Sequence, residues 1–148
     1  PHNPKLQANW ISLDDVARFM IASLDRPDME GAWLNIGGPE RLVGKTVSEI
    51  LSRKFGKEIK YDPCTPKEFG DLLANAGGDD VPKEQRDELA AGITAFYEYN
   101  NKAETRPFEV EMDHVYERFP ELEGELETME EWVQRQDWTE SNHRPAFG

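Results

Sequence analysis

The sequence predicts an α/β protein whose first half mixes helices with short strands and whose second half is mainly helical. Three observations support this class. Helix-start signals recur ahead of apolar residues at helical spacing, two short runs have strand character, and the longest helical pattern lies after residue 80. The 148 residues suit one unit with a core of its own, and we expect residues 1–148 to form a single unit.

The first helix is expected to begin after Ser12. The Ser12 side chain can cap the first free amide groups, and Asp15 lies in the positively polarised first turn. Apolar residues then follow at helical spacing, and Pro27 and Gly31 end the pattern. Together these signals predict a helix over about residues 13–24.

Two strands are expected in the first half. Residues 32–36 are mostly apolar, which predicts a strand covered on both faces, and residues 58–62 alternate as a half-exposed strand does. Two strands are too few to make a stable sheet alone. We therefore expect that part of the sheet is missing from this chain or is supplied by a partner.

Further helices are expected from their terminal residues. Thr46 and Glu49 form a capping-box pattern whose helix would end at Gly56, and Thr65 precedes a proline at a first helical position. The second half adds a long helix over about 82–101, a strand or extended loop over 108–112, a short helix over 113–119, a capping box over 128–131 and a tail over 142–148.

The acidic balance of the chain limits the partners that it can have. Hydrophobic residues make up 37% of the chain and charged residues 32%, and the net charge is −13. Most of this excess lies in residues 109–140, which have a net charge of −10, so a nucleic-acid partner is not expected. No apolar run is long enough to cross a membrane. The single cysteine, Cys64, fits a reducing compartment, and we expect a cytoplasmic location.

The run from Gly38 to Thr46 resembles a phosphate-binding loop but has the wrong spacing. Five residues separate Gly38 from Gly44 where the motif needs four, and Pro39 has no amide hydrogen to donate to a phosphate. Two turns and a capping Thr46 account for the same residues. We therefore expect no nucleotide site here.

Other catalytic patterns are equally hard to find. The sequence has no G-x-G-x-x-G fingerprint, and its three histidines lie far apart. We expect no metal site, and the sequence identifies no catalytic residue.

Several segments in order resemble one family. They are WISLDDVA at residues 10–17, WLNIGGPE at 33–40, TVSEI at 46–50 followed by FGKEIKY at 55–61, PKEF at 66–69, and MEEWV at 129–133 with Asp137-Trp138. These segments are similar to the second half of NmrA-like proteins, which are atypical members of the short-chain dehydrogenase/reductase superfamily. The resemblance is dense over residues 9–73 and returns at 128–138.

The resemblance implies an architecture and a site. Residues 9–63 would supply the last strands of a Rossmann-like sheet, 64–140 a mainly helical substrate-binding lobe and 141–148 a tail, without the dinucleotide-binding half. The complete family protein would bind NAD(P), but this chain alone would bind no cofactor. The residues implied to contact a small-molecule substrate are Asn9, Trp10, Gly37, Gly38, Pro39 and Phe69. Trp10 could stack on a ligand or pack as a hydrophobic staple before the Ser12 cap.

Three functions follow from this resemblance. The chain could be the substrate-binding, pocket-closing part of an NAD(P)-dependent reductase or isomerase, inactive without the dinucleotide-binding half. It could be a sensor without catalysis, whose acidic segment docks a partner protein. It could also be a free-standing binding module that a homodimer completes.

Overall fold

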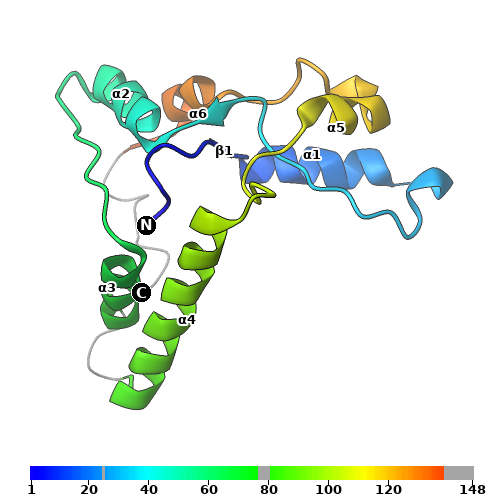
Figure 1. Cartoon of the computed structure of the whole chain (residues 1–148). Coiled ribbons are helices and arrows are strands. Elements are labelled where there is room, and N and C mark those ends of the chain that lie inside the picture. The colour runs from blue at the N-terminus through cyan, green and yellow to red at the C-terminus, as the bar shows by residue number, and fades with distance from the viewer. Residues whose placement is uncertain (25, 77–80, 139–148) are drawn as a thin grey trace. The chain divides into compact units, whose positions relative to one another are not determined.

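The computed structural model describes residues 1–24, 26–76 and 81–138. The described chain is mostly helical and has one small antiparallel sheet (Figure 1), an architecture consistent with part of an α/β fold. The elements in chain order are β1 (Ala8–Asn9), α1 (Leu13–Ser23), η1 (Pro27–Met29), β2 (Arg41–Leu42), α2 (Gly44–Phe55), α3 (Pro66–Ala76), α4 (Lys83–Lys102), α5 (Met112–Arg118), η2 (Pro120–Leu122) and α6 (Met129–Arg135).

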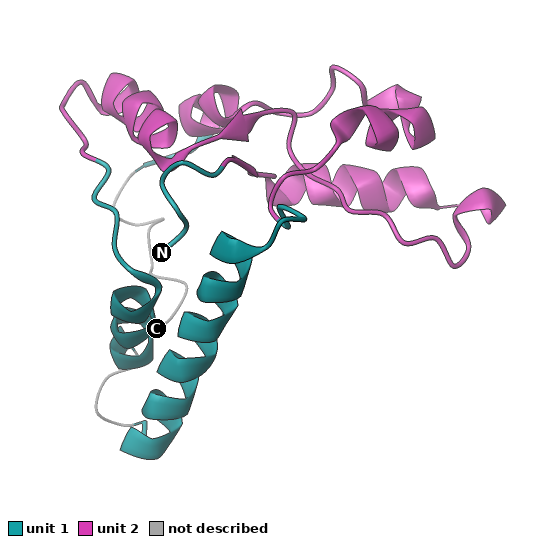
Figure 2. Cartoon of the chain, viewed as in Figure 1, with its two compact units in different colours: residues 1–6, 61–107, 136–148 teal, residues 7–60, 108–135 magenta. Residues whose placement is uncertain are grey.

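The chain divides into two compact units (Figure 2). Unit 1 comprises Pro1–Leu6, Tyr61–Pro107 and the segment from Gln136 onward, and unit 2 comprises Gln7–Lys60 and Phe108–Arg135. Part of the segment expected to form a helical lobe, residues 108–135, thus packs with the first half of the chain. The tail expected over 141–148 lies outside the described residues.

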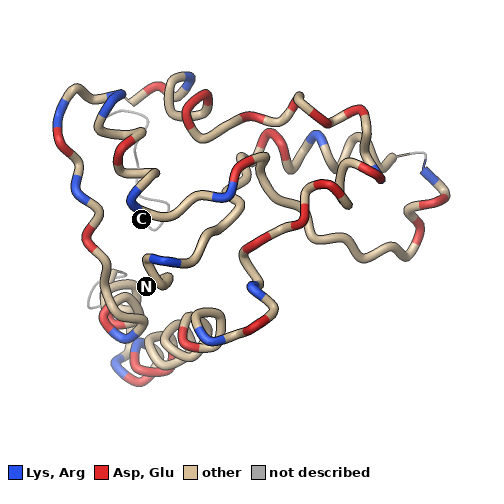
Figure 3. The backbone as a smooth tube through the Cα atoms, turned by 45° about the horizontal axis from the view of Figure 1, so that its top comes forward, with Lys and Arg blue, Asp and Glu red and all other residues tan. Residues whose placement is uncertain are grey.

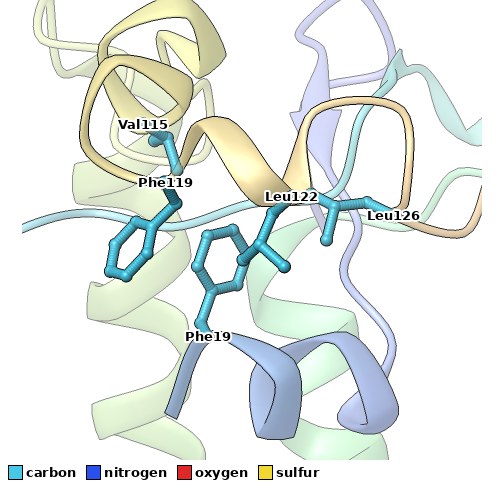
Figure 4. Close-up of a cluster of buried hydrophobic side chains, with 5 residues drawn as sticks. All are labelled: Phe19, Val115, Phe119, Leu122 and Leu126. Carbon is cyan, nitrogen blue, oxygen red and sulfur yellow. The ribbon is translucent and has the colours of Figure 1, made fainter. Parts of the chain in front are cut away.

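A small aromatic and aliphatic core holds unit 2 together. Its buried members are Phe19, Val115, Phe119, Leu122 and Leu126 (Figure 4). The rings of Phe19 and Phe119 meet edge to face with centroids 5.3 Å apart, a geometry that aromatic pairs favour. Because Phe19 comes from α1 and Val115 from α5, this core joins residues almost 100 positions apart in the sequence.

The buried carboxylate of Asp15 ties α1 to the segment before α6. Ser12 caps α1 as expected, accepting a hydrogen bond from the amide of Asp15 at 3.1 Å. Only 1% of Asp15 is exposed, and its Oδ2 accepts a hydrogen bond from the amide of Glu127 at 3.0 Å. The Arg18 guanidinium lies 3.5 Å from Oδ1, so the buried charge has a hydrogen bond and an opposite charge beside it.

The other side of α1 is exposed although it is apolar. Its large exposed apolar side chains are Leu13, Met20 and Ile21, with Leu24 at the C-cap, and Leu13 is 86% exposed. Trp33, in the loop after η1, is 99% exposed. Unit 2 therefore leaves a contiguous stretch of one helix in contact with water where a folded protein usually has a covering layer.

Neither expected strand forms. Residues 32–36 have no regular structure, and Ala32 instead closes a turn by donating to the carbonyl of Met29 at 3.0 Å. The segment 58–62 is also not a strand, and the amide of Ile59 donates instead to the hydroxyl of Ser52 at 2.8 Å. The sheet observed among the described residues pairs Ala8 with Leu42 and Asn9 with Arg41, and the sequence did not predict it.

The helix termini follow the expected chemistry in most places. The helix start at Thr65 and the capping box at Thr128 are confirmed. At both sites the threonine and the glutamate three residues later exchange hydrogen bonds, so Thr65 also forms a box, which we did not predict from the sequence. Gly56 ends α2 in the left-handed conformation at φ 62°. The expected cap at Thr46 is wrong, since α2 already begins at Gly44 after an extended Val43 and Thr46 lies within its first turn.

Unit 1 is built on two helices, α3 and α4, that pack along each other (Figure 1). A Cβ at Gly70 would lie 2.6 Å from the carbonyl oxygen of Ala90, so glycine lets the two helices approach closely. The end of α4 also anchors the N-terminal segment, because the Asn101 side chain accepts from the amide of Asn3 at 2.8 Å and donates to the carbonyl of Pro1 at 2.9 Å.

Replacing Asp15 with alanine should destabilise unit 2 by about 1–3 kcal/mol, because the amide of Glu127 would lose its partner in a buried setting. Urea unfolding followed by circular dichroism measures this loss. The matched control is Asp14→Ala, since Asp14 is exposed on the same turn and its ion pair with Arg135 lies at the surface. Equal losses from the two variants would contradict the role given to Asp15.

The pKa of Glu131 should lie below its usual value, because the backbone amide and the hydroxyl of Thr128 both donate hydrogen bonds to its carboxylate. The stabilisation is therefore present above the carboxyl pKa of the unfolded chain and is lost as the pH falls through the lower folded value. Carbon-detected NMR titration measures this pKa. Thr128→Val should bring the pKa of Glu131 part of the way back to its usual value, because the backbone amide of residue 128 still donates. An unchanged pKa in the variant would count against the capping box.

Candidate functional site

Five of the six expected site residues gather in unit 2, and Asn9 holds them together. Its side chain donates to the carbonyl of Gly38 at 2.9 Å and accepts from the amide of Val110 at 2.8 Å. Its own amide donates to the carbonyl of Phe108 at 2.9 Å. One asparagine thus joins three segments, β1, the turn at 37–39 and the loop at 108–110.

The two glycines of the turn pack against the backbone of the segment after β1. Both are buried. A Cβ at Gly37 would lie 2.6 Å from the Cβ of Asn9, and a Cβ at Gly38 would lie 1.8 Å from the carbonyl oxygen of Trp10. No side chain larger than hydrogen fits at Gly38. These glycines therefore fix the backbone of this cluster and present little surface to a ligand.

Trp10 and Pro39 offer the accessible surface of this cluster. Trp10 is 55% exposed, while the adjacent Ile11 packs against the core of unit 2. The core contact expected of a staple residue thus belongs to Ile11, and the Trp10 ring stays accessible for stacking. Pro39 is half-buried, and the following Glu40 turns inward, where its carboxylate accepts from the amide of Met129 at 2.9 Å.

The sequence did not single out Arg41, which lies beside this turn. Its Nη2 donates to the carbonyl of Val110 at 2.9 Å and contacts the carboxylate of Glu111 at 2.7 Å, while Nη1 lies 4.0 Å from Glu109. The alternation of Glu109 and Glu111 about Val110 was the sequence signal from which this contact could have been predicted. Because Arg41 is occupied by these partners, it serves the local fold and presents no free cation to a ligand.

The described residues of this cluster do not form an acid–base or metal centre. Within the described ranges no group of three metal-binding side chains comes together. His114 and Glu117 approach to 3.4 Å, but both side chains are exposed on α5.

Asp and Glu outnumber Lys and Arg by 30 to 17, and their positions are spread along the trace (Figure 3). No helix among the described residues is long and apolar enough to cross a membrane.

Phe69, the sixth expected site residue, lies in unit 1 and lines a groove between α3 and α4. The groove has a volume of about 730 Å³. Its lining residues are Phe69, Leu73, Gln85, Glu88, Leu89, Gly92, Ile93, Phe96 and Tyr97. The sequence showed an apolar stripe on α4 but gave no sign that part of it would line an open groove.

Aromatic rings define one end of the groove. Phe69 and Tyr97 meet edge to face with centroids 5.4 Å apart, and Phe96 and Tyr97 do the same at 5.2 Å. Gly92 opens the middle of the groove, since a Cβ placed there would meet no atom within 4 Å. The arrangement leaves an apolar hollow with aromatic rings beside it, the usual character of a small-molecule site.

Comparisons with known proteins agree with this architecture. The chain is similar to a nucleoside-diphosphate-sugar epimerase from Staphylococcus aureus, with 25% identity and a TM-score of 0.56 over 91% of this chain and 43% of that one. The chain has the fold of part of a short-chain dehydrogenase/reductase-like protein. It is also 30% identical over 69 residues to prestalk A differentiation protein A of Dictyostelium discoideum, which covers 47% of this chain and 23% of that protein.

The chain therefore spans less than half the length of either protein to which it is similar. No protein-family model matches the chain. The complete members of this superfamily bind NAD(P), and the similarity supports that property for the superfamily and not for this chain alone.

Replacing Gly38 with alanine should destabilise unit 2 by about 3 kcal/mol, because the new Cβ collides with the backbone of Trp10 and the chain must shift to accept it. Thermal and urea unfolding measure the loss.

The matched control is Gly92→Ala in α4. It adds the same methyl group into open space and should raise stability by about 1 kcal/mol through helix propensity. A tolerated Gly38→Ala variant would show that the turn relaxes easily and does not fix the site.

Proposed function

We propose that this chain is the substrate-binding and pocket-closing portion of an NAD(P)-dependent oxidoreductase, and that the dinucleotide is held by a separate half. The observation that carries the proposal is the similarity over 91% of this chain to only 43% of a nucleoside-diphosphate-sugar epimerase. The order of the sequence motifs supports the same assignment, because these motifs resemble segments in the second half of NmrA-like proteins.

The structure of the two candidate regions supports the assignment of the dinucleotide to a separate half. The turn at Gly37 and Gly38 has no strand before it, since residues 32–36 form no ladder within the described chain. A pyrophosphate site needs such a strand, a glycine-rich turn and a helix N-terminus in succession. The groove of unit 1, in contrast, offers apolar surface suited to a substrate.

Trp10 and Phe69 are the proposed substrate contacts in their respective units. Trp10 presents an exposed ring beside the glycine turn, and Phe69 lines the groove. Asn9, Gly37 and Gly38 act through the backbone that they position, and Pro39 shapes the rim. The catalytic groups would come from the half that holds the dinucleotide.

A regulatory role is the second candidate. It is favoured by the similarity to a protein named for differentiation. In that case the completed protein would bind a dinucleotide, and binding would change its affinity for a partner protein. Dinucleotide binding by the completed protein without turnover of any substrate would favour this candidate.

Isothermal titration of the chain with NADPH should give no binding in the micromolar range, because no segment among the described residues has the strand, glycine-rich turn and helix N-terminus that hold a pyrophosphate. An NADPH-dependent enzyme in the same buffer provides the positive control. Micromolar binding with a 1:1 stoichiometry would contradict the proposed division of function and would place a dinucleotide site within this chain.

A further inference from the structure

We propose that the groove between α3 and α4 binds an aromatic ligand that is neutral or positively charged, and that it excludes a nucleoside diphosphate. This inference rests on the proposed function in treating the groove as a substrate site, and it adds the chemical class of the substrate. It sets this chain apart from the sugar-nucleotide chemistry named for the similar epimerase.

The charge of the groove argues against a diphosphate. Glu88 is the one charged side chain among the described residues that line it, and no lysine or arginine does so. Recognition of phosphate ordinarily uses arginine or lysine, or a set of backbone amides at a helix N-terminus. Arg86, the nearest cation in sequence, lines a different hollow together with Asp71 and Asp87. Lys67 and Lys83 are each paired with an aspartate one turn later on their own helix.

The remaining lining favours an aromatic group. Phe96 is 51% exposed, so part of its ring is accessible from the groove. Aromatic rings accept another ring edge to face, and their faces attract a cation. A ligand that carries an ammonium group could place it near the Glu88 carboxylate while its ring occupies the apolar part of the groove.

Charge also disfavours a second copy of the chain as the occupant. In a two-fold pairing of this face, each copy would bring its Glu88 into the shared apolar interface, where an unpaired carboxylate is costly. The net charge of −13 on each chain adds a general repulsion. The volume of about 730 Å³ lies in the range typical of small-molecule sites.

Three probes that share a phenylalkyl group test the proposal on the full chain. They are 4-phenylbutylamine, 4-phenylbutanol and 4-phenylbutyrate, which carry a positive, a neutral and a negative group, and UDP-glucose serves as the nucleoside-diphosphate probe. We expect the amine to bind most tightly, roughly two- to fivefold tighter than the carboxylate, as one exposed charge pair allows. Protein NMR shifts locate the site and give the affinities.

Two variants tie this binding to the groove. Gly92→Leu fills the open middle of the groove and should abolish binding of all three phenyl probes while the helix content stays the same. Glu88→Lys, at an exposed position, should reverse the preference toward the carboxylate. Glu84→Lys is the matched control, because it makes the same charge change one turn earlier on α4 at a residue that does not line the groove.

The outcomes separate this inference from the proposed function. Tighter binding of UDP-glucose than of the amine, no binding of any phenyl probe, self-association through this face, or a reversal by Glu84→Lys equal to that by Glu88→Lys would each overturn the inference. Amine-selective binding that Gly92→Leu abolishes supports it. If NADPH also binds the isolated chain, the proposed function fails while the groove keeps its ligand.

Discussion

The Asn9 side chain is the constraint on which the arrangement of unit 2 depends. Each strand of the sheet is only two residues long, so the backbone hydrogen bonds of the sheet cannot hold the neighbouring loops. The Asn9 amide group replaces a third strand by bonding the turn at Gly38 on one side and the loop at Val110 on the other. The glycines then permit the close approach that these bonds require.

Side chains fasten the remaining loops in the same manner. Asp15 accepts a hydrogen bond from the amide of Glu127, just before α6, and Glu40 accepts one from the amide of Met129, where α6 begins. The hydroxyl of Ser52 accepts a hydrogen bond from the amide of Ile59. Arg135 adds hydrogen bonds to Glu127 and Asp14, which raise the pKa of its guanidinium. Much of unit 2 is thus held by polar side chains bonded to the backbone, with a small apolar core beneath them.

The sequence predicted most helices because capping and periodicity are local properties. Ser12, Thr65 and Thr128 each contact residues three positions away, and such contacts can be found in a single sequence. The predictions of strands were wrong for the opposite reason. A strand forms only beside a partner strand, and residues 32–36 have no partner strand in the described chain. Arg41 and the opening at Gly92 were missed likewise, because both depend on segments distant in the sequence or on the next helix.

The uncovered apolar side of α1 affects how the chain responds to temperature. Leu13, Met20, Ile21 and Leu24 are already hydrated in the folded state, so unfolding adds little new apolar surface at these positions. The heat-capacity increment of unfolding reflects newly hydrated apolar area and should therefore be small for a chain of this length. A small increment flattens the curve of the free energy of unfolding against temperature, so the stability of the chain should change gradually on cooling and heating.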